Sequence, residues 1–487
     1  MNLGEEMDLT FFKTKFNIYP ESINIKGKYA YFLIDCGEYD QLCITGGEDS
    51  FPGKVYCQSG YIYTLCELNH ETAVFLRNTF PFCAPASILD RKTTFGTGDR
   101  LGVAGGGLVR VFKEYDVFPV LAQQSMREMA LTHRTMADVI DSTTFTVFRE
   151  GYRCGYGADG DHLKKIDEVQ AAIDCGYTMI TLDCSDYIDN QAAILPDADI
   201  ETQYVAKRKL EDRYLNRPFE IGPNTTLFYD LASLRRIITV YEKAIDFINF
   251  VYLRCICSHI KEINLEISID ETSIITSPLA HYFVANELKI RGIRFATIAP
   301  RFSGEFQKGI DYIGDPETLR KEIRIHNIIA KYFGYKLSFH SGSDKFSVFS
   351  IINEETQGHF HIKTSGTNWL EAMRVIAIYK PLLFRKMYEI SLKTFEANRS
   401  FYHVTPDLET IPDVDKMMNE ELPSLLDLAA SRQVLHIGYG KVLEDPNLKK
   451  ILYLTLREYR NEYSNMLYAH ISHHAQNLGI LHGCCAR

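Results

Sequence analysis

The 487-residue sequence contains no Cys-x-x-Cys pair, although it has twelve cysteines. A zinc ribbon or a thioredoxin-type redox site is therefore not expected, and the scattered cysteines are predicted to be reduced thiols. No apolar run approaches the ~18 residues that a membrane-spanning helix needs. The residues after Met1 include acids where a secretory signal would carry basic side chains. These absences predict a cytoplasmic protein without a membrane partner.

An excess of positive charge is also missing, since 53 lysines and arginines face 63 aspartates and glutamates, for a net charge of −10. A nucleic-acid partner is not expected, because phosphate binding needs a basic surface and no basic-aromatic stripe is present. The hydrophobic share of 46% is ordinary for a globular protein. The length exceeds that of one ordinary domain and leaves a homo-oligomer open.

Short alternating runs broken by glycine predict a β-rich subdomain over residues 1–80. The pattern then changes to strands alternating with helices, which indicates an α/β domain, a (β/α)₈ TIM-type barrel, over 81–395. An insertion is expected at 184–262, and a C-terminal helical extension at 396–487. The predicted barrel strands are 93–97, 118–122, 143–149, 178–183, 263–270, 293–298, 336–340 and 359–364.

Polar side chains follow most of these strands, and the carboxyl ends of barrel strands form active sites. Gln124 and Ser125, after the second strand, suit hydrogen bonds to sugar hydroxyls, although Ser125 equally suits a helix cap. Arg301, after the sixth strand, can fork onto a substrate carboxylate. The other candidates at strand ends are Asp183, Lys345 and Lys363.

A carboxylate and an imidazole stand side by side at Asp161 and His162, in a glycine-rich segment that suits metal binding and acid–base chemistry. The alternative is that Asp161 caps a helix and His162 faces solvent. Asp270 and Glu271 end the fifth strand, and side-chain alternation predicts that only one, Glu271, points into the barrel mouth.

The segment KLSFHSGSDK (336–345) gathers an imidazole, small turn residues and a cation at the end of the seventh strand. His340 is therefore expected in a ligand site. Gln307, after the sixth strand, supplies an oxygen that could join it.

Six segments together resemble the tagaturonate/fructuronate epimerase family, and they extend over most of the predicted barrel. They are PVLAQQSMRE (119–128), GADGDHLK (157–164), SIDETS (268–273), PRFSGEFQKGIDYIGD (300–315), LSFHSGSDKF (337–346) and KTSGTNWLEAMR (363–374). The glycine-rich stretch 104–107 departs from the family pattern, which leaves the role of the first barrel loop open.

The resemblance implies a divalent-metal-dependent epimerase that interconverts D-tagaturonate and D-fructuronate by inversion at carbon 4 of the ketose. It further implies Asp161 as proton acceptor, Glu271 as proton donor, and His162, Gln307 and His340 as ligands of Mn²⁺, Ni²⁺, Co²⁺ or Zn²⁺. The hydrogen at carbon 4 is not acidic, so the inversion is expected to run by retro-aldol cleavage and aldol re-formation.

The same residues would also serve a metal-dependent aldolase that releases its fragments, or a ketose–aldose isomerase acting on sugar acids. A non-catalytic sugar-acid binding protein is a more remote alternative. Free three-carbon products would identify the aldolase, and deuterium incorporation at carbons 1 and 2 would identify the isomerase.

Overall fold

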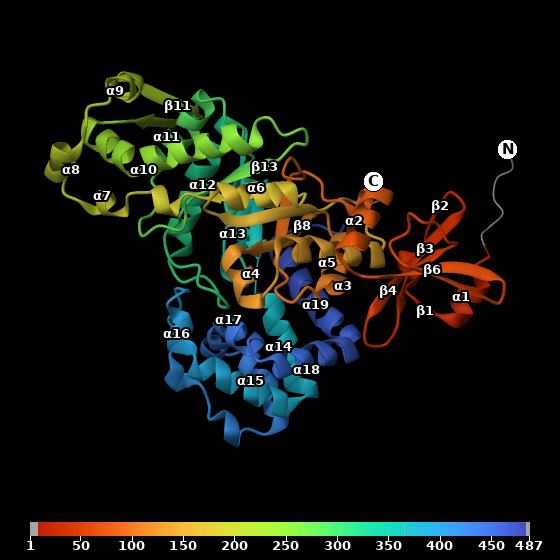
Figure 1. Cartoon of the computed structure of the whole chain (residues 1–487). Coiled ribbons are helices and arrows are strands. Elements are labelled where there is room, and N and C mark those ends of the chain that lie inside the picture. The colour runs from red at the N-terminus through yellow and green to blue at the C-terminus, as the bar shows by residue number, and fades with distance from the viewer. Residues whose placement is uncertain (1–7, 365, 484–487) are drawn as a thin grey trace.

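Eight parallel strands close into a barrel at the centre of the computed structural model, which describes residues 8–364 and 366–483 (Figure 1). In chain order they are β7 (Thr93–Thr97), β8 (Phe118–Ser125), β9 (Gly157–Leu163), β10 (Met179–Asp183), β13 (Asn264–Ser268), β14 (Thr297–Ala299), β15 (Lys336–Phe339) and β16 (Phe360–Thr364). The last strand, β16, pairs in parallel with the first, β7, and so closes the barrel. The predicted TIM-type barrel is confirmed.

Helices alternate with these strands and bury their apolar faces against the outside of the barrel. They are α3 (Gly105–Glu114), α4 (Met126–Thr132), α5 (Met136–Arg149), α6 (Ile166–Asp174), α11 (Pro278–Ile290), α12 (Pro316–Phe333), α13 (Phe346–Thr356) and α14 (Thr367–Tyr379). Along each strand, successive side chains point alternately into the barrel and away from it. Apolar side chains such as Leu265 and Ile267 point away from the barrel interior and pack in the core outside the sheet.

The third predicted strand, 143–149, is wrong because this segment is the second half of helix α5. A capping box starts the helix, in which the side chains of Thr135 and Asp138 each accept a backbone N–H of the other residue. The buried residues of α5 recur at helical spacing. The β-branched residues of this segment have an intrinsic preference for strands, but the preference is weak and tertiary packing overrides it.

The true third strand is β9, whose glycine-rich segment follows the predicted strand in the chain. Two glycines let it pack closely, because a Cβ at Gly157 would lie 3.0 Å from Val120, and one at Gly160 would lie 2.8 Å from Leu163. Gly, Asp and His are poor strand formers, so this central strand carried no propensity signal.

An antiparallel sheet precedes the barrel and lies to one side of it (Figure 1). The sheet contains β1 (Asn17–Ile18), β2 (Asn24–Lys26), β3 (Tyr29–Asp35), β4 (Asp40–Thr45), β5 (Lys54–Gln58) and β6 (Tyr61–Glu67). The helices α1 (Thr10–Lys15) and α2 (His70–Thr79) come before and after it in the chain. The first seven residues of the predicted β-rich subdomain lie outside the described residues.

The insertion after β10 forms a separate lobe on the side of the barrel away from the N-terminal sheet (Figure 1). It contains α7 (Asn190–Ile194), α8 (Asp197–Gln203), α9 (Arg208–Tyr214), β11 (Pro218–Gly222), β12 (Thr225–Phe228) and α10 (Leu231–Val251). The long helix α10 is capped at its N-terminus by Asp230, whose side chain accepts the backbone N–H of Ser233.

The C-terminal part is helical, and residues 484–487 of it lie outside the described residues. The helices are α15 (Pro381–Lys393), α16 (Phe395–Arg399), α17 (Ala429–Leu443), α18 (Pro446–Glu458) and α19 (Arg460–Asn477). Helix α19 packs against α3 and α14, while α17 packs against α15 and α4. Across residues 8–364 and 366–483, no helix has both the length and the apolar character that crossing a bilayer would require.

Candidate active site

A cavity of about 410 Å³ opens at the carboxyl ends of the barrel strands. Its lining includes Asp161, His162, Asp183, Glu271, Lys308, His340 and Lys363. A larger cavity of about 650 Å³ lies between the N-terminal sheet and the C-terminal helices. Most of its charged groups are paired with one another, as Asp35 is with Arg457 and Arg460 at 2.6 and 2.7 Å. The cavity at the barrel mouth is therefore the better candidate for an active site, because acidic, basic and imidazole side chains line it together.

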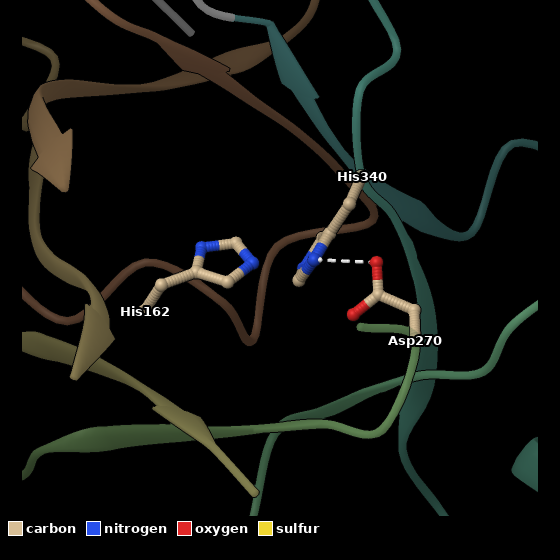
Figure 2. A group of neighbouring side chains, drawn as sticks. All are labelled: His162, Asp270 and His340. Carbon is tan, nitrogen blue, oxygen red and sulfur yellow. Dashed lines mark ion pairs between the residues drawn. The ribbon is translucent and has the colours of Figure 1, made fainter. Parts of the chain in front are cut away.

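Two imidazoles from different strand ends meet in this cavity, with the ring centroids of His162 and His340 4.8 Å apart. Asp270 completes the group, and its Oδ2 lies 3.1 Å from His340 Nδ1 (Figure 2). One donor atom from each of these three residues lies within 4.8 Å of the others. Sequence reasoning expected the two histidines to meet, and it did not expect Asp270 to join them.

Each histidine holds a carboxylate with one nitrogen and directs the other toward the shared centre. His162 Nδ1 bonds Asp161 at 2.9 Å, and His340 Nε2 bonds Glu266 at 2.8 Å. Of the remaining nitrogens, His162 Nε2 is buried without a hydrogen-bond partner among the described residues, and His340 Nδ1 is buried 3.1 Å from Asp270 Oδ2. Metal-binding histidines are typically oriented by this kind of outer carboxylate. The three residues therefore fit a divalent cation.

Protonation of His340 is set by competing effects. Burial lowers the pKa of its imidazole, but Asp270 and Glu266 raise it more, to about 10. The pKa of Asp270 moves the other way, because His340 and His162 outweigh its burial and hold the pKa below the usual range. Without a cation the imidazole is therefore charged, and a cation would take the place of its proton.

A bulge in β9 positions His162. The pairing of β9 with β10 shifts register before Leu163, and His162 has a left-handed backbone with φ of 56°. Bulges of this kind re-aim a side chain, and they are common beside active sites. Asp161 lies within the strand, opposite Ser125 of β8, and does not cap a helix.

Beneath the histidines, Lys363 is surrounded by carboxylates. Its Nζ lies 2.7 Å from Asp159, 2.8 Å from Asp161 and 2.9 Å from Glu266. Burial raises the pKa of Asp161, but Lys363 and His162 lower it more, so the carboxyl is ionised. Three acids around one lysine leave this buried centre net negative, which favours a further cation above it.

Asp270 and Glu271 both follow the end of β13 at Ser268, so strand alternation does not choose between them. Glu271 lines the barrel-mouth cavity, as its predicted position requires, and Asp270 also reaches the site through His340. Both line an adjoining cavity of about 160 Å³, which shares Glu271, Lys308 and His340 with the cavity at the barrel mouth. Glu271 is the more exposed, and its Oε1 lies 3.9 Å from His162 Nε2.

Gln307 lines the same side of the cavity, but its amide bonds the C-terminal extension. Its Oε1 accepts hydrogen bonds from the Thr405 N–H at 3.0 Å and from Gln433 Nε2 at 2.8 Å. Its role as a metal ligand stays a prediction, and that role would require the oxygen to leave these donors.

The remaining predicted substrate residues are divided between the cavity and the scaffold. Ser125 lines the cavity and also caps α4 by accepting the Glu128 N–H, and Asp183 lines it too. Gln124 is not among the lining residues; it bonds Thr132 and Arg134. Its neighbour Gln123 lines the cavity instead.

Of the two predicted cations Lys345 and Arg301, the first bonds the scaffold and the second lines a cavity. Lys345 donates to the backbone carbonyls of Gln307, Ile310 and Ser343, so its charge supports a loop. Arg301 lines the adjoining cavity, where Nη1 lies 3.5 Å from the Asp270 carbonyl oxygen.

A second histidine–carboxylate group lies outside this cavity, where Asp344 meets His470 and His474 of α19. The Asp344 N–H donates to His474 Nε2 at 2.9 Å, and Asp344 Oδ2 pairs with Arg432 at 2.6 Å. Because His474 Nε2 and Asp344 Oδ2 already have partners within the protein, we assign this group a structural role. It fixes the loop that follows His340.

Comparisons with known proteins match nearly the whole chain. Residues 19–478 match the family model described as tagaturonate epimerase. A tagaturonate/fructuronate epimerase of Thermotoga maritima is 38% identical over 483 residues, which cover 97% of this chain and 100% of that protein. A glycerol-complexed crystal structure of a fructuronate-tagaturonate epimerase from Cohnella laeviribosi superposes with a TM-score of 0.93 at 40% identity, covering 97% of this chain and 98% of that one. The native structure of the same Cohnella enzyme also gives a TM-score of 0.93, and covers 96% and 98%. With the match of residues 19–478 to the family model and nearly its full length and fold shared with these proteins, the chain belongs to the tagaturonate epimerase family.

Proposed function

We propose that this isomerase interconverts D-tagaturonate and D-fructuronate by inverting carbon 4 of the ketose, with a divalent cation at His162, Asp270 and His340. The observation that carries the proposal is the convergence of one buried imidazole nitrogen from each of His162 and His340 on the carboxylate of Asp270. Family membership supplies the substrate class.

His162 and His340 would hold the cation through Nε2 and Nδ1, and Asp270 would hold it through a carboxylate oxygen. Gln307 stays a predicted fourth ligand. When bound, such a cation supplies Lewis acidity at the ketone oxygen of the substrate.

The chain's own groups would move the protons. Asp161 is ionised and lines the cavity, so it can accept the proton of the carbon-4 hydroxyl. The bond between carbons 3 and 4 then breaks, the aldehyde rotates, and the bond re-forms on the opposite face. Glu271, across the cavity beside His162, is the proposed donor that returns the proton to the new hydroxyl. A well-placed acid or base contributes typically ~10²–10⁴ in rate.

The direct test is turnover of D-tagaturonate by protein stripped with a chelator and reloaded with Mn²⁺, Ni²⁺, Co²⁺ or Zn²⁺. D-Fructuronate should form only after reloading. Full activity in the stripped protein would refute the metal requirement, and no turnover with any metal would refute the epimerase proposal. Free three-carbon products would indicate an aldolase instead.

Two variants separate the proposed roles. His340→Ala should lose both bound metal and activity, because it removes a ligand. Asp161→Asn should keep the metal and lower kcat by about 10²–10⁴-fold. Metal analysis beside steady-state kinetics checks both, and a His340→Ala protein that keeps metal and activity would show that the ligand set is wrong.

A further inference from the structure

One cation of the cavity was not singled out by sequence reasoning. Lys308 follows β14 in the chain, and it lines both the barrel-mouth cavity and the part beside Asp270. Its Nζ donates to Ser341 Oγ at 2.9 Å. Ser341 directly follows His340, so the ammonium lies beside the proposed metal site.

Among the described residues that line the barrel-mouth cavity, the other cations are either paired or at an exposed rim. Lys363 has its three carboxylates, and Lys164 pairs with Asp186 at 2.6 Å. Arg127 and Lys165 are exposed, and water can solvate them. Lys308 forms no ion pair with any carboxylate in the described part of the chain, although it is partly buried.

A partly buried ammonium without an ion pair lowers the stability of the free protein. The Lys308 ammonium carries three donors, and Ser341 is its one hydrogen-bond partner among residues 8–364 and 366–483, so the other donors have no acceptor there. A carboxylate that entered the cavity would complete this hydrogen bonding and compensate the charge.

We infer that Lys308, oriented by the Ser341 hydroxyl, is the site that binds the carboxylate of the substrate. The inference rests on the proposed function. It replaces Arg301, which was predicted to bind the carboxylate, because Arg301 lines the adjoining cavity and not the one at the barrel mouth. Lys345 and Lys363 are committed to protein oxygens. Lys308 would thereby select keto-hexuronates over neutral ketoses, which carry a hydroxymethyl group at the same position.

The test compares charged and neutral ligands in the metal-loaded enzyme. Lys308→Met keeps the length of the side chain but removes its charge. We expect KM for D-tagaturonate to rise by about 10–100-fold with kcat changed much less, because a charge-assisted hydrogen bond is lost from bound substrate and transition state alike. The inhibition constant of neutral D-tagatose should change by less than about threefold. Lys308→Arg should recover much of the loss.

Lys164→Met is the matched control, since it removes the same charge from the same cavity where that charge is already paired. It should leave the ratio of the D-tagaturonate and D-tagatose constants within about threefold of wild type. Equal losses for both ligands in Lys308→Met, or no loss for either, would overturn the assignment while the epimerase proposal stands.

Binding without turnover separates the two proposals. Calorimetric titration with D-galactonate and with galactitol measures the carboxylate preference even if the wild type does not convert D-tagaturonate. The wild type should prefer D-galactonate, and Lys308→Met should lose that preference. A preference unchanged by the substitution would refute the carboxylate site.

Discussion

Lys363 shows how one side chain can hold an active site together. It links carboxylates from β9 and β13 through Asp159, Asp161 and Glu266, all within 2.9 Å of its Nζ. Glu266 in turn holds His340, and Asp161 holds His162. The orientation of both imidazoles therefore depends on this lysine, although it is not one of the proposed ligands.

We predict that Lys363→Met lowers the free energy of unfolding by about 3–5 kcal/mol, because three buried carboxylates lose their shared cation. Urea denaturation at pH 7 measures the loss. Lys331→Met is the control, since Lys331 is exposed and bonds only Gln357 among the described residues, and it should change the free energy by less than ~0.5 kcal/mol. Similar small values for both variants would contradict the central role of Lys363.

Residues at strand ends and in recognisable segments could be found from the sequence. Asp161, His162 and His340 were expected in one cavity, and they lie in one. Asp159 and Glu266 were missed because they point into the barrel from within strands, where a charged residue is normally not expected. Lys308 carried no local pattern, since its isolation from carboxylates is visible only in three dimensions.

At the scale of elements, seven of the eight barrel strands could be predicted because apolar and β-branched residues mark them, and each overlaps an observed strand. The exception is the third strand, which was predicted at 143–149, within α5, and is in fact β9. The strand with the most important side chains was the hardest to identify, since glycine and aspartate suit its function better than its secondary structure.

Helix α11 illustrates how loop positions near the site are fixed. It follows the loop that carries Asp270 and Glu271, and it begins at Ser277, whose hydroxyl accepts the Ala280 N–H at 3.1 Å, with Pro278 in the first turn. A serine cap followed by proline is a strong start signal.

We predict that Ser277→Ala lowers the free energy of unfolding by about 1 kcal/mol, because the cap is lost. Ser277→Asp should stay close to wild type, since a carboxylate also caps and suits the positive end of a helix. Chemical denaturation of the three proteins tests this. Equal destabilisation by alanine and aspartate would argue against a capping role.

Across the whole molecule, the N-terminal sheet is tied to the C-terminal helices by ion pairs of Asp35. Burial raises the pKa of this carboxyl, but the Gly37 N–H, Arg460 and Arg457 together lower it more. A folded-state pKa below the unfolded value of about 3.9 stabilises the protein above that pH. The contribution is lost as the pH falls from about 5 through the folded pKa.

We therefore predict that Asp35→Asn costs about 1–3 kcal/mol at pH 7, and that the difference from wild type shrinks as the pH falls below about 4. Urea denaturation at pH 7, 5 and 3.5 measures it. Asp49→Asn, at an exposed position of the same subdomain and without an ion pair in the described chain, is the control and should show no such trend. A difference independent of pH would contradict the ionic origin.

The joining of β16 to β7 has a consequence for how the protein is made on the ribosome. β7 is the first barrel strand to be synthesised, and its partner at 360–364 is the last. Until that late segment emerges, one edge of the nascent sheet has no neighbour, and open edges invite pairing with other chains. Cells that produce this protein at high rates should therefore depend on chaperones during the interval between the two strands.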